Sequence, residues 1–487
     1  MIAIGNIGYK ETAARSSRSR AAFTVEDIFC FFLITGLAWV PFWIGSNRGY
    51  PWGINSTVFS HGLLEDRLIP WGINAVLFPG MVAVYEILLV VRRLPHPTPL
   101  RCIRLSVILF AIVVAWIFIQ NATWIPVEWQ HPVWQLAADA LGRNIRGSIS
   151  VDRDLTTLAL IRLMTSASVF WLALQLCCDA WRARLLLWSI AGIGAAYAAI
   201  GLSGLGLFTS SHFVSSTFVN RNNYATYDGI GFVSILGLIL RFYSRELRGG
   251  GDNLRLKIAL LISSMGTKGA IPLVLAFVIV TALLFSGSRG GNLSTLLGVL
   301  VLLVLIALRS RRRFGLNETG FIIVVVLAIG AVFFSFGDLI VGRIETDGLG
   351  DAWRLDIYRI TVQSIVSAPL LGYGYGTFPS VFAMFRDSSI DMWPALDMAH
   401  NTYLEVFQGL GLIFGAALIG SVVLLVVQCL KASVVLRRNA TLPAVAASVS
   451  FLVGLHALVD FSLQIQAVTL TFMAVLGAGV AISHSGS

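Results

Sequence analysis

The chain has 487 residues, of which 56% are hydrophobic and 12% are charged, and its mean hydropathy is +0.81. Soluble domains carry about twice this share of charged residues, so the composition excludes a soluble globular protein and predicts an all-α polytopic membrane protein. The formal net charge of +10 is not gathered on a basic face with interleaved aromatics. It therefore argues against nucleic acid as a partner and favours contact with anionic membrane lipids.

Twelve apolar runs of the sequence are long enough to cross a bilayer. They divide the chain into an N-terminal tail at 1–27, nine spans within 28–340, a large loop at 341–401, and three spans with the C-terminus within 402–487. The expected fold is therefore about 12 transmembrane helices with one large, partly helical loop. The runs lie at 28–44, 72–91, 105–120, 157–178, 185–208, 224–243, 271–287, 291–308, 321–340, 402–430, 440–459 and 463–483.

The distribution of cations predicts the orientation, because cytoplasmic loops are enriched in Lys and Arg. Most of these residues, including every lysine, fall in loops on the side of the two termini, which an even number of spans places together. This predicts cytoplasmic termini and an exterior loop at 341–401. The exterior cations are all arginines, whose planar fork grips phosphate and carboxylate oxygens. A GC-rich genome would explain the same skew equally well.

Two exterior arginines are expected unusually close to the hydrocarbon. Arg221 lies among amides just before the sixth span, and Arg289 lies in the SGSRGG turn at 286–291, which leaves almost no room between the seventh and eighth spans. A charge at such depth is costly unless it faces a polar cavity or a partner. The two arginines are therefore candidates for binding an anion at the exterior edge of the membrane.

His400 stands immediately before the apolar run at 402–430. Asn401 or Thr402 can cap a helix there, and the positive end of that helix favours the neutral imidazole, which can accept a proton. For one histidine alone, an interfacial polar residue is the commoner explanation. The two deep arginines on the same side favour a site that includes His400.

Three further features of the exterior side have both a structural and a functional interpretation. A helix is expected over 351–366, with Trp353, Ile357, Ile360 and Ile365 as its apolar stripe and Pro369 beyond its end. The glycines of GYGYGTF at 372–378 resemble a phosphate-binding loop, but no strand–turn–helix unit surrounds them. His456 and Asp460 lie four residues apart, so on a helix they would share a face, either as a structural contact, the commoner case, or as a couple that orients a base.

Five motifs in order along the chain resemble the O-antigen ligase and O-antigen polymerase family of bacterial envelope enzymes. Each motif is weak alone, but their order on a twelve-span chain is fairly specific, and the resemblance extends from about residue 120 to residue 480. The motifs are FVNRNNYATY at 218–227, SGSRGG at 286–291, PLLGYGYGTF at 369–378, AHNTYLEVFQGLG at 399–411 and HALVDFSLQIQA at 456–467.

The resemblance implies a multi-pass glycosyltransferase of the bacterial inner membrane, with a fold similar to membrane lipid-sugar-dependent transferases and an active site that faces the periplasm. Its donor would be a glycan on undecaprenyl pyrophosphate, and its acceptor a hydroxyl of the lipid A core or, for a polymerase, of the growing polysaccharide. By matching motifs, His400 would be the catalytic histidine, and Arg221 and Arg289 would hold the pyrophosphate. Further candidates for substrate contact are Arg354, Asn401, Tyr403 and Tyr224. The chain departs from the family at Gln408, where an acidic residue is common, and at Gln466, where proline is common.

The expected chemistry needs no cofactor. Departure of a diphosphate develops negative charge that fixed arginines can stabilise, and no Asp-x-Asp pair for a divalent metal stands near Arg221 or Arg289. The main rival from another class is a transporter or flippase of lipid-linked sugars. Such proteins usually have two similar halves and charged or broken helices near mid-membrane. Here the halves do not resemble each other, and the clear polar residue within a span is Glu86, with Pro79 as a nearby break.

Overall fold

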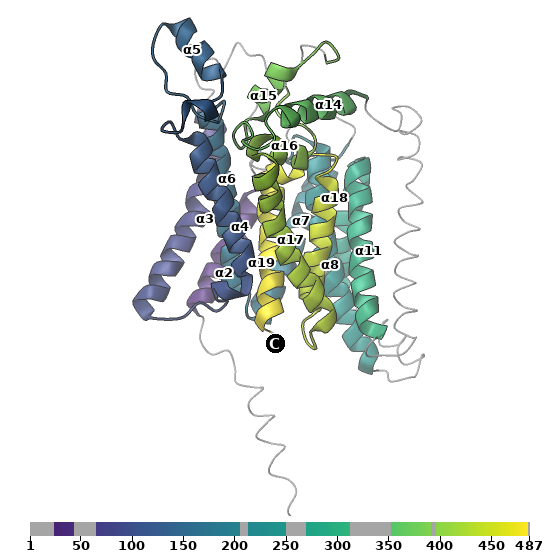
Figure 1. Cartoon of the computed structure of the whole chain (residues 1–487). Helices are drawn as coiled ribbons and strands as arrows, with labels where there is room; N and C mark the ends of the chain where they lie inside the picture. Colours follow the sequence, from purple (N-terminus) through teal and green to yellow (C-terminus); the bar gives the residue numbers. More distant parts are fainter. Residues whose placement is uncertain are drawn as a thin grey trace, which may run out of the picture.

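The computed structural model describes residues 24–42, 65–204, 213–249, 269–311, 352–390 and 396–485. Across these ranges the chain forms helices and no strand, which confirms the predicted all-α class (Figure 1). Nine of the described helices are long and apolar enough to span a bilayer, and two shorter ones are apolar as well. The chain is a multi-pass membrane protein. The span expected at 321–340 and most of the N-terminal tail lie outside the described residues.

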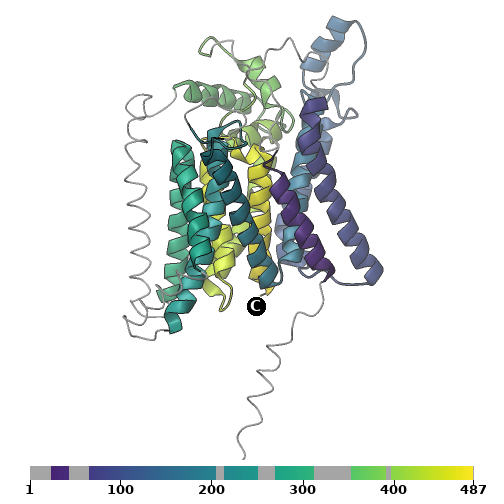
Figure 2. The same cartoon turned by 180° about the vertical axis from the view of Figure 1, so that it is seen from behind.

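The apolar helices run roughly parallel to one another through most of the molecule (Figures 1 and 2). They are α2 (Val25–Trp39), α3 (Glu65–Arg92), α4 (Arg104–Asn121), α6 (Arg153–Leu176), α7 (Ala180–Leu202), α8 (Arg221–Gly249), α10 (Ala270–Phe285), α11 (Arg289–Arg311), α17 (Leu412–Val435), α18 (Thr441–His456) and α19 (Gln466–Ser485). Shorter helices are α5 (Val133–Leu141), α14 (Ala352–Ser367), α15 (Phe378–Phe385) and α16 (Thr402–Leu410), with single 3₁₀ turns at η2 (Leu100–Ile103), η3 (Val127–Trp129) and η4 (Ser462–Gln464).

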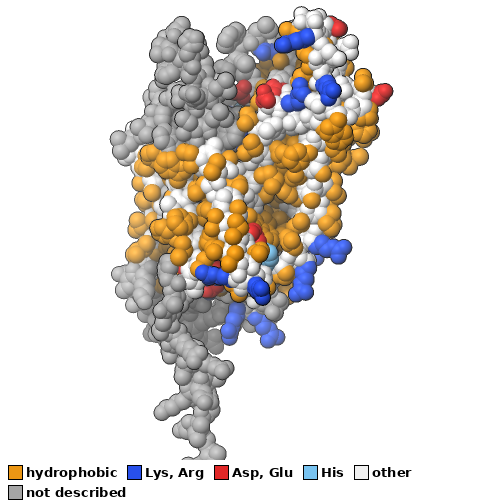
Figure 3. Space-filling model, turned by 90° about the vertical axis from the view of Figure 1, so that its left-hand side faces the viewer, with side chains coloured by type: hydrophobic (Ala, Val, Ile, Leu, Met, Phe, Trp, Pro, Cys, Tyr) orange, Lys and Arg blue, Asp and Glu red, His pale blue; other side chains and the backbone are white. Residues whose placement is uncertain are grey.

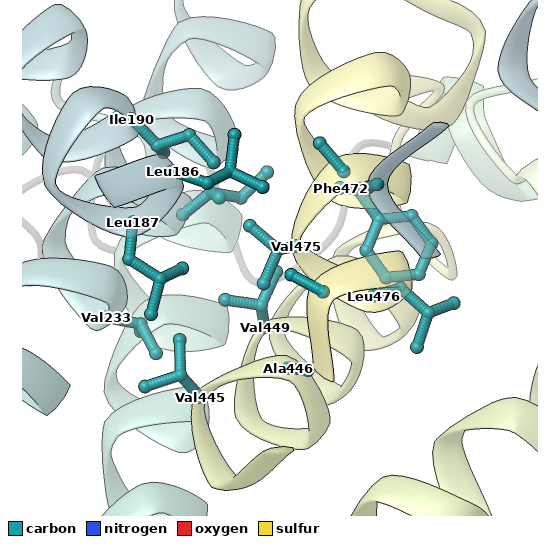
Figure 4. Close-up of a cluster of buried hydrophobic side chains, with 14 of the residues drawn as sticks. Leu186, Leu187, Ile190, Val233, Val445, Ala446, Val449, Phe472, Val475 and Leu476 are labelled. Carbon is teal, nitrogen blue, oxygen red and sulfur yellow. The ribbon is translucent and has the colours of Figure 1, made fainter. Parts of the chain in front are cut away.

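The core of the bundle lies around α8, α18 and α19. In the apolar window of α8 89% of the residues are buried, and in that of α19 78%, whereas no other candidate span exceeds 50%. Leu187 of α7, Val233 of α8, Val445 of α18 and Val475 of α19 converge from four helices in this core (Figure 4). Lipid tails are as apolar as these side chains, so close packing rather than exclusion of water holds the helices together.

Polar side chains within the spans have partners that join neighbouring helices. The Asn74 amide donates a 2.8 Å hydrogen bond to Gln466 Oε1, which ties α3 to α19. The carboxylate of Glu86 lies 2.7 Å from His96 Nε2 and accepts a 2.6 Å hydrogen bond from Trp171. Glu86 thus joins α3 to α6. On the face drawn in Figure 3, a broad apolar band separates charged side chains at the two ends, as expected of a surface that contacts lipid.

One end of the bundle is covered by α14, α15 and α16, which together form the cap (top of Figure 1). The run at 402–430, predicted as a single span, is two helices in the structure, because α16 ends at Leu410 and α17 starts at Leu412. Gly411 between them has φ +78°, and a Cβ there would lie 2.3 Å from the carbonyl oxygen of Leu370. Only glycine fits this backbone conformation and this close approach. As predicted, the helix that precedes Pro369 ends before it, at Ser367.

The contact between α18 and α19 provides a test of the packing. A Cβ added at Gly479 would lie 2.2 Å from that of Ala446, whereas one added at Gly192 of α7 would meet no atom within 4 Å. We expect Gly479→Ala to destabilise the protein by about 1–3 kcal/mol through overpacking. Thermal unfolding in detergent should show a lower Tm for Gly479→Ala and no decrease for the control Gly192→Ala. Equal Tm values for both variants would contradict this account of the core.

Candidate functional site

Several helix ends meet where the bundle joins the cap. α8 starts at Arg221, α11 starts at Arg289, α18 ends at His456, and α16 starts two residues after His400. α8, α11 and α18 pack against one another. The turn from His456 to Ser462, here called the His456–Ser462 segment, follows α18 and contacts the other elements. Sequence positions more than two hundred residues apart therefore meet at one end of the bundle.

The backbone of His400 is fixed from both sides. Its φ is +54°, in the left-handed region that residues other than glycine rarely adopt. Asn401 caps α16, because its side-chain oxygen accepts hydrogen bonds of 3.1 Å from the amides of Tyr403 and Leu404. The Tyr358 hydroxyl of α14 donates to the His400 carbonyl at 2.9 Å. Such strained conformations persist only where neighbours hold them, and they concentrate at functional sites.

Asn401 and Thr402 attach the backbone next to His400 to the end of α18 and the turn after it. The Asn401 side-chain amide donates to the Leu458 carbonyl, and the Thr402 backbone amide donates to the Ala457 carbonyl, both at 2.9 Å. Glu405, in the first turn of α16, accepts a 2.6 Å hydrogen bond from the Ala399 amide and another from the Gln464 side chain. His400 is therefore held on a rigid frame and not on a free loop.

The imidazole of His400 lies in an aromatic and acidic environment. Its side chain is 17% exposed, and its Nδ1 is 3.9 Å from Asp460 Oδ1. The ring packs edge to face against Phe461, at 4.9 Å between centroids, and against Trp353 of α14, at 5.8 Å. A separation of 3.9 Å is longer than a hydrogen bond, so the carboxylate acts on the imidazole through its charge.

Asp460 is nearly fully buried and cannot turn away from this position. Its side chain is 1% exposed, Oδ1 accepts a 2.7 Å hydrogen bond from the Phe461 amide, and Oδ2 accepts one of 2.7 Å from the Asn222 side chain. Asn222 follows Arg221 directly at the start of α8. The carboxylate thus connects the start of α8 to His400.

The i,i+4 spacing of His456 and Asp460 suggested a couple, but the structure gives the two residues different partners. α18 ends at His456, so the two side chains do not share a helical face. His456 is 1% exposed, and its Nδ1 lies 2.8 Å from the hydroxyls of both Thr226 and Ser462. These contacts join α8, α18 and the following turn, so His456 has the surroundings of a structural residue.

Arg221 and Arg289 are each the first residue of a helix. The guanidinium of Arg221 lies 4.3 Å from the centroid of the Phe213 ring. Gly290, next to Arg289, packs against His456, because a Cβ at Gly290 would lie 3.2 Å from His456 Nε2. The residue that follows each arginine is therefore in contact with the end of α18 or the turn after it: Asn222 with Asp460, and Gly290 with His456. The backbone amides at the start of a helix carry partial positive charge, so the two arginines add to two positive helix ends.

The other residues predicted to contact substrate have structural partners. Nη1 of Arg354 donates to the Val459 carbonyl at 3.1 Å. The Tyr403 hydroxyl donates to the Gly454 carbonyl at 2.9 Å and so points toward α18. Tyr224 is fully buried beside Phe218, and its hydroxyl adjoins the buried carboxyl of Asp228. Asn401 is the N-terminal capping residue of α16, as described above.

The GYGYG turn does not have the geometry of a phosphate loop. The amides of Tyr373 and Gly374 donate to the carbonyls of Gln408 and Gly409 at 3.1 and 3.0 Å, so they are already used within the protein. A Cβ on Gly374 would meet Ser150, and one on Gly376 would meet Ala159 of α6. These glycines let the turn approach the ends of α16 and α6 closely, which is a structural role.

Sequence analysis missed Asn222, Glu405 and Asp228. The signals for the first two were present, because Asn222 adjoins Arg221 and an acidic residue in the first turn of a helix is a common capping device. Asp228 is fully buried within a span, where an acidic side chain is a functional candidate by default. Among the described residues, no group of three or more His, Cys, Asp or Glu side chains is placed to hold a metal ion.

A cluster of polar contacts fastens α14 to the segment after α15. Arg359 donates to Asp387 at 2.9 Å and to the Ser389 hydroxyl at 2.8 Å. Hydrogen bonds from the hydroxyl and amide of Ser389, and then the Arg359 guanidinium, lower the pKa of Asp387 from 3.8 to about 2. A pKa that is lower in the folded state means that the carboxylate stabilises the fold above the unfolded value, and that this contribution is lost as the pH falls toward 2.

We therefore expect Asp387→Asn to loosen the cap at pH 6 and to differ much less from wild type near pH 2, where the wild-type carboxyl is itself about half protonated. Hydrogen exchange of the peptides within 352–390, measured across this pH range in detergent, tests the expectation. Asp139→Asn, on the exposed surface of α5, is the control. A difference between Asp387→Asn and wild type that persists unchanged at the lowest pH would contradict it.

Comparison with known proteins gives evidence on the function of this site. Residues 274–419, from α10 to α17, match the family model described as O-antigen ligase. The match includes the Arg289 turn, the GYGYG turn and His400, and it lies within the range of the resemblance drawn from the five motifs. No curated protein matches the chain. Residues 274–419 of this multi-pass membrane protein are thus a domain of the O-antigen ligase family.

Proposed function

We propose that the protein is a ligase-type glycosyltransferase that moves a glycan from undecaprenyl pyrophosphate to a hydroxyl of the lipid A core. The observation that carries the proposal is that the starts of α8, α11 and α16 all contact the end of α18 or the turn after it. Arg221 and Arg289 are the first residues of α8 and α11, and His400 lies two residues before α16. Helix starts attract anions, and arginine binds phosphate oxygens bidentately. An imidazole beside such an anion site suits proton removal from an acceptor.

The two arginines would hold the pyrophosphate of the donor. As the bond between the anomeric carbon and the pyrophosphate oxygen breaks, negative charge develops on the leaving group. Arg221 and Arg289 each add a guanidinium to a positive helix end, so this charge would meet fixed donors that need no reorganisation. The match to the O-antigen ligase family supports a lipid-linked glycan as the donor class.

His400 would act as the general base. The acceptor O–H bond breaks, its proton moves to the imidazole, and its oxygen forms the new bond to the anomeric carbon. The charge of Asp460, 3.9 Å from Nδ1, would stabilise the imidazolium that results. Because Asn222 and the Phe461 amide hold the carboxylate in place, this stabilisation is present before the proton moves. Proton transfer to a positioned base is typically worth about 10²–10⁴ in rate.

We place the cap on the periplasmic side of the bacterial inner membrane, with both termini in the cytoplasm and residues 341–401 as the large periplasmic loop. The asymmetry of Lys and Arg supports this orientation. A polymerase would use the same donor with the growing polysaccharide as acceptor. Transport of lipid-linked sugar is less well supported, because Glu86, the polar residue that favoured it, is bonded to His96 and Trp171.

The proposal predicts that His400→Ala abolishes transfer and leaves folding intact, because the imidazole is needed to remove a proton while the backbone is held by other residues. The assay uses purified protein in liposomes with undecaprenyl-pyrophosphate-linked glycan and lipid A core acceptor. His484→Ala, at the opposite end of α19, is the control and should be active. Transfer by His400→Ala at the wild-type rate would remove His400 from the mechanism.

We also expect Arg221→Lys and Arg289→Lys each to lower kcat/KM by roughly a hundredfold or more, since lysine keeps the charge but loses the fork. Exposed Arg143→Lys is the matched control and should retain activity. Steady-state kinetics with varied donor are the measurement. Normal donor KM and kcat in both lysine variants would mean that these arginines serve membrane topology alone.

A further inference from the structure

Trp353 does not behave like the rest of the apolar stripe of α14. The sequence groups it with Ile357, Ile360 and Ile365, and these three side chains are 0%, 0% and 8% exposed. Trp353 is 39% exposed, although its ring contacts the imidazole of His400. Burial in the cap therefore does not account for this tryptophan.

The start of α14 is held over the site. Arg354, next to Trp353, donates to the Val459 carbonyl at 3.1 Å, and Tyr358, one turn further along, donates to the His400 carbonyl at 2.9 Å. The indole is thus mounted on an anchored helix with one edge-to-face contact to His400, and a substantial part of its surface remains accessible. Binding groups on anchored helices hold their position more precisely than groups on loops.

An exposed indole beside a proposed base suits a sugar ring. A pyranose presents a face of C–H groups that packs on a flat aromatic surface, while its hydroxyls remain at the edge, free to hydrogen-bond. Tryptophan offers a large rigid surface at a low cost in conformational entropy. The imidazole of His400 does not need the Trp353 ring to hold it in place, because Phe461 packs more closely on the imidazole, at 4.9 Å between centroids.

We propose that the exposed indole face of Trp353 is the stacking platform for the sugar ring of the acceptor and presents its hydroxyl to His400. This inference rests on the proposed function. The base must lie within hydrogen-bond reach of the hydroxyl that it deprotonates, so the acceptor ring has to lie beside His400, and Trp353 adjoins His400. The donor pyrophosphate occupies the starts of α8 and α11 instead.

Steady-state kinetics with independently varied donor and acceptor test the platform. We expect Trp353→Ala to raise the acceptor KM roughly ten- to a hundredfold, with donor KM and kcat at saturating acceptor within about twofold of wild type. Trp353→Phe keeps a smaller ring and should lie between wild type and Trp353→Leu. Leu355→Ala, on the same helix and 65% exposed, is the control and should leave all three constants unchanged. Elution as a monodisperse species in detergent verifies folding, and Trp353→Phe suffices if Trp353→Ala misfolds.

Three results would overturn the platform. A fall in kcat with unchanged acceptor KM, together with a shifted pH profile, would mean that Trp353 only positions His400. A rise confined to donor KM would assign the surface to the donor sugar. Equal kinetics for wild type and Trp353→Leu, with weaker insertion of the variant into liposomes, would make Trp353 an interfacial anchor. The proposed role of His400 as the base is tested separately. If His400→Ala is active, that role is wrong, whatever the acceptor KM of the Trp353 variants.

Discussion

Positive charge at the starts of α8 and α11 is the constraint on which the candidate site depends. Helices ordinarily carry acidic residues in the first turn, because the exposed amides there repel cations. Arg221 and Arg289 occupy the first positions of two adjacent helices, so they add positive charge to helix ends that attract anions. The buried carboxylate of Asp460 is turned toward His400 by Asn222 and the Phe461 amide. The candidate site therefore combines an imidazole that has a buried carboxylate beside it with two cationic positions.

Close helix packing below the cap keeps these positions fixed. A Cβ on Gly229 of α8 would lie 2.3 Å from Thr295 of α11, and one on Gly298 of α11 would lie 2.9 Å from Leu452 of α18. Such contacts leave no room for the three helices to slide past one another. The cap adds a second layer, since α14 reaches both His400 and the turn after α18 through Tyr358 and Arg354. The proposed stabilisation of a leaving group would require rigidity of this kind in both layers.

Much of the fold followed from the sequence because insertion into a bilayer depends on local composition, which hydropathy reports directly. The break at Gly411 did not follow, since it depends on the carbonyl of Leu370, which approaches from the cap. The same limit applies to the site. His400, Arg221 and Arg289 were proposed from residue type, position and motif. The contact between Asp460 and His400 was not predicted, because it depends on the end of α18 at His456, after which the chain turns the carboxylate toward His400. Tyr224 was a candidate for substrate contact, yet on α8 it is completely buried.

The His456–Ser462 segment has a consequence for biosynthesis. It contacts α8, α14 and the start of α16, all of which precede it in the chain. A ribosome delivers those helices to the membrane first, and domains form in the order of their emergence. His400, Arg221 and Arg289 are thus inserted before the His456–Ser462 segment has been synthesised. An unfinished chain has no assembled candidate site, because that site cannot form until α18 and the turn that follows have entered the bundle.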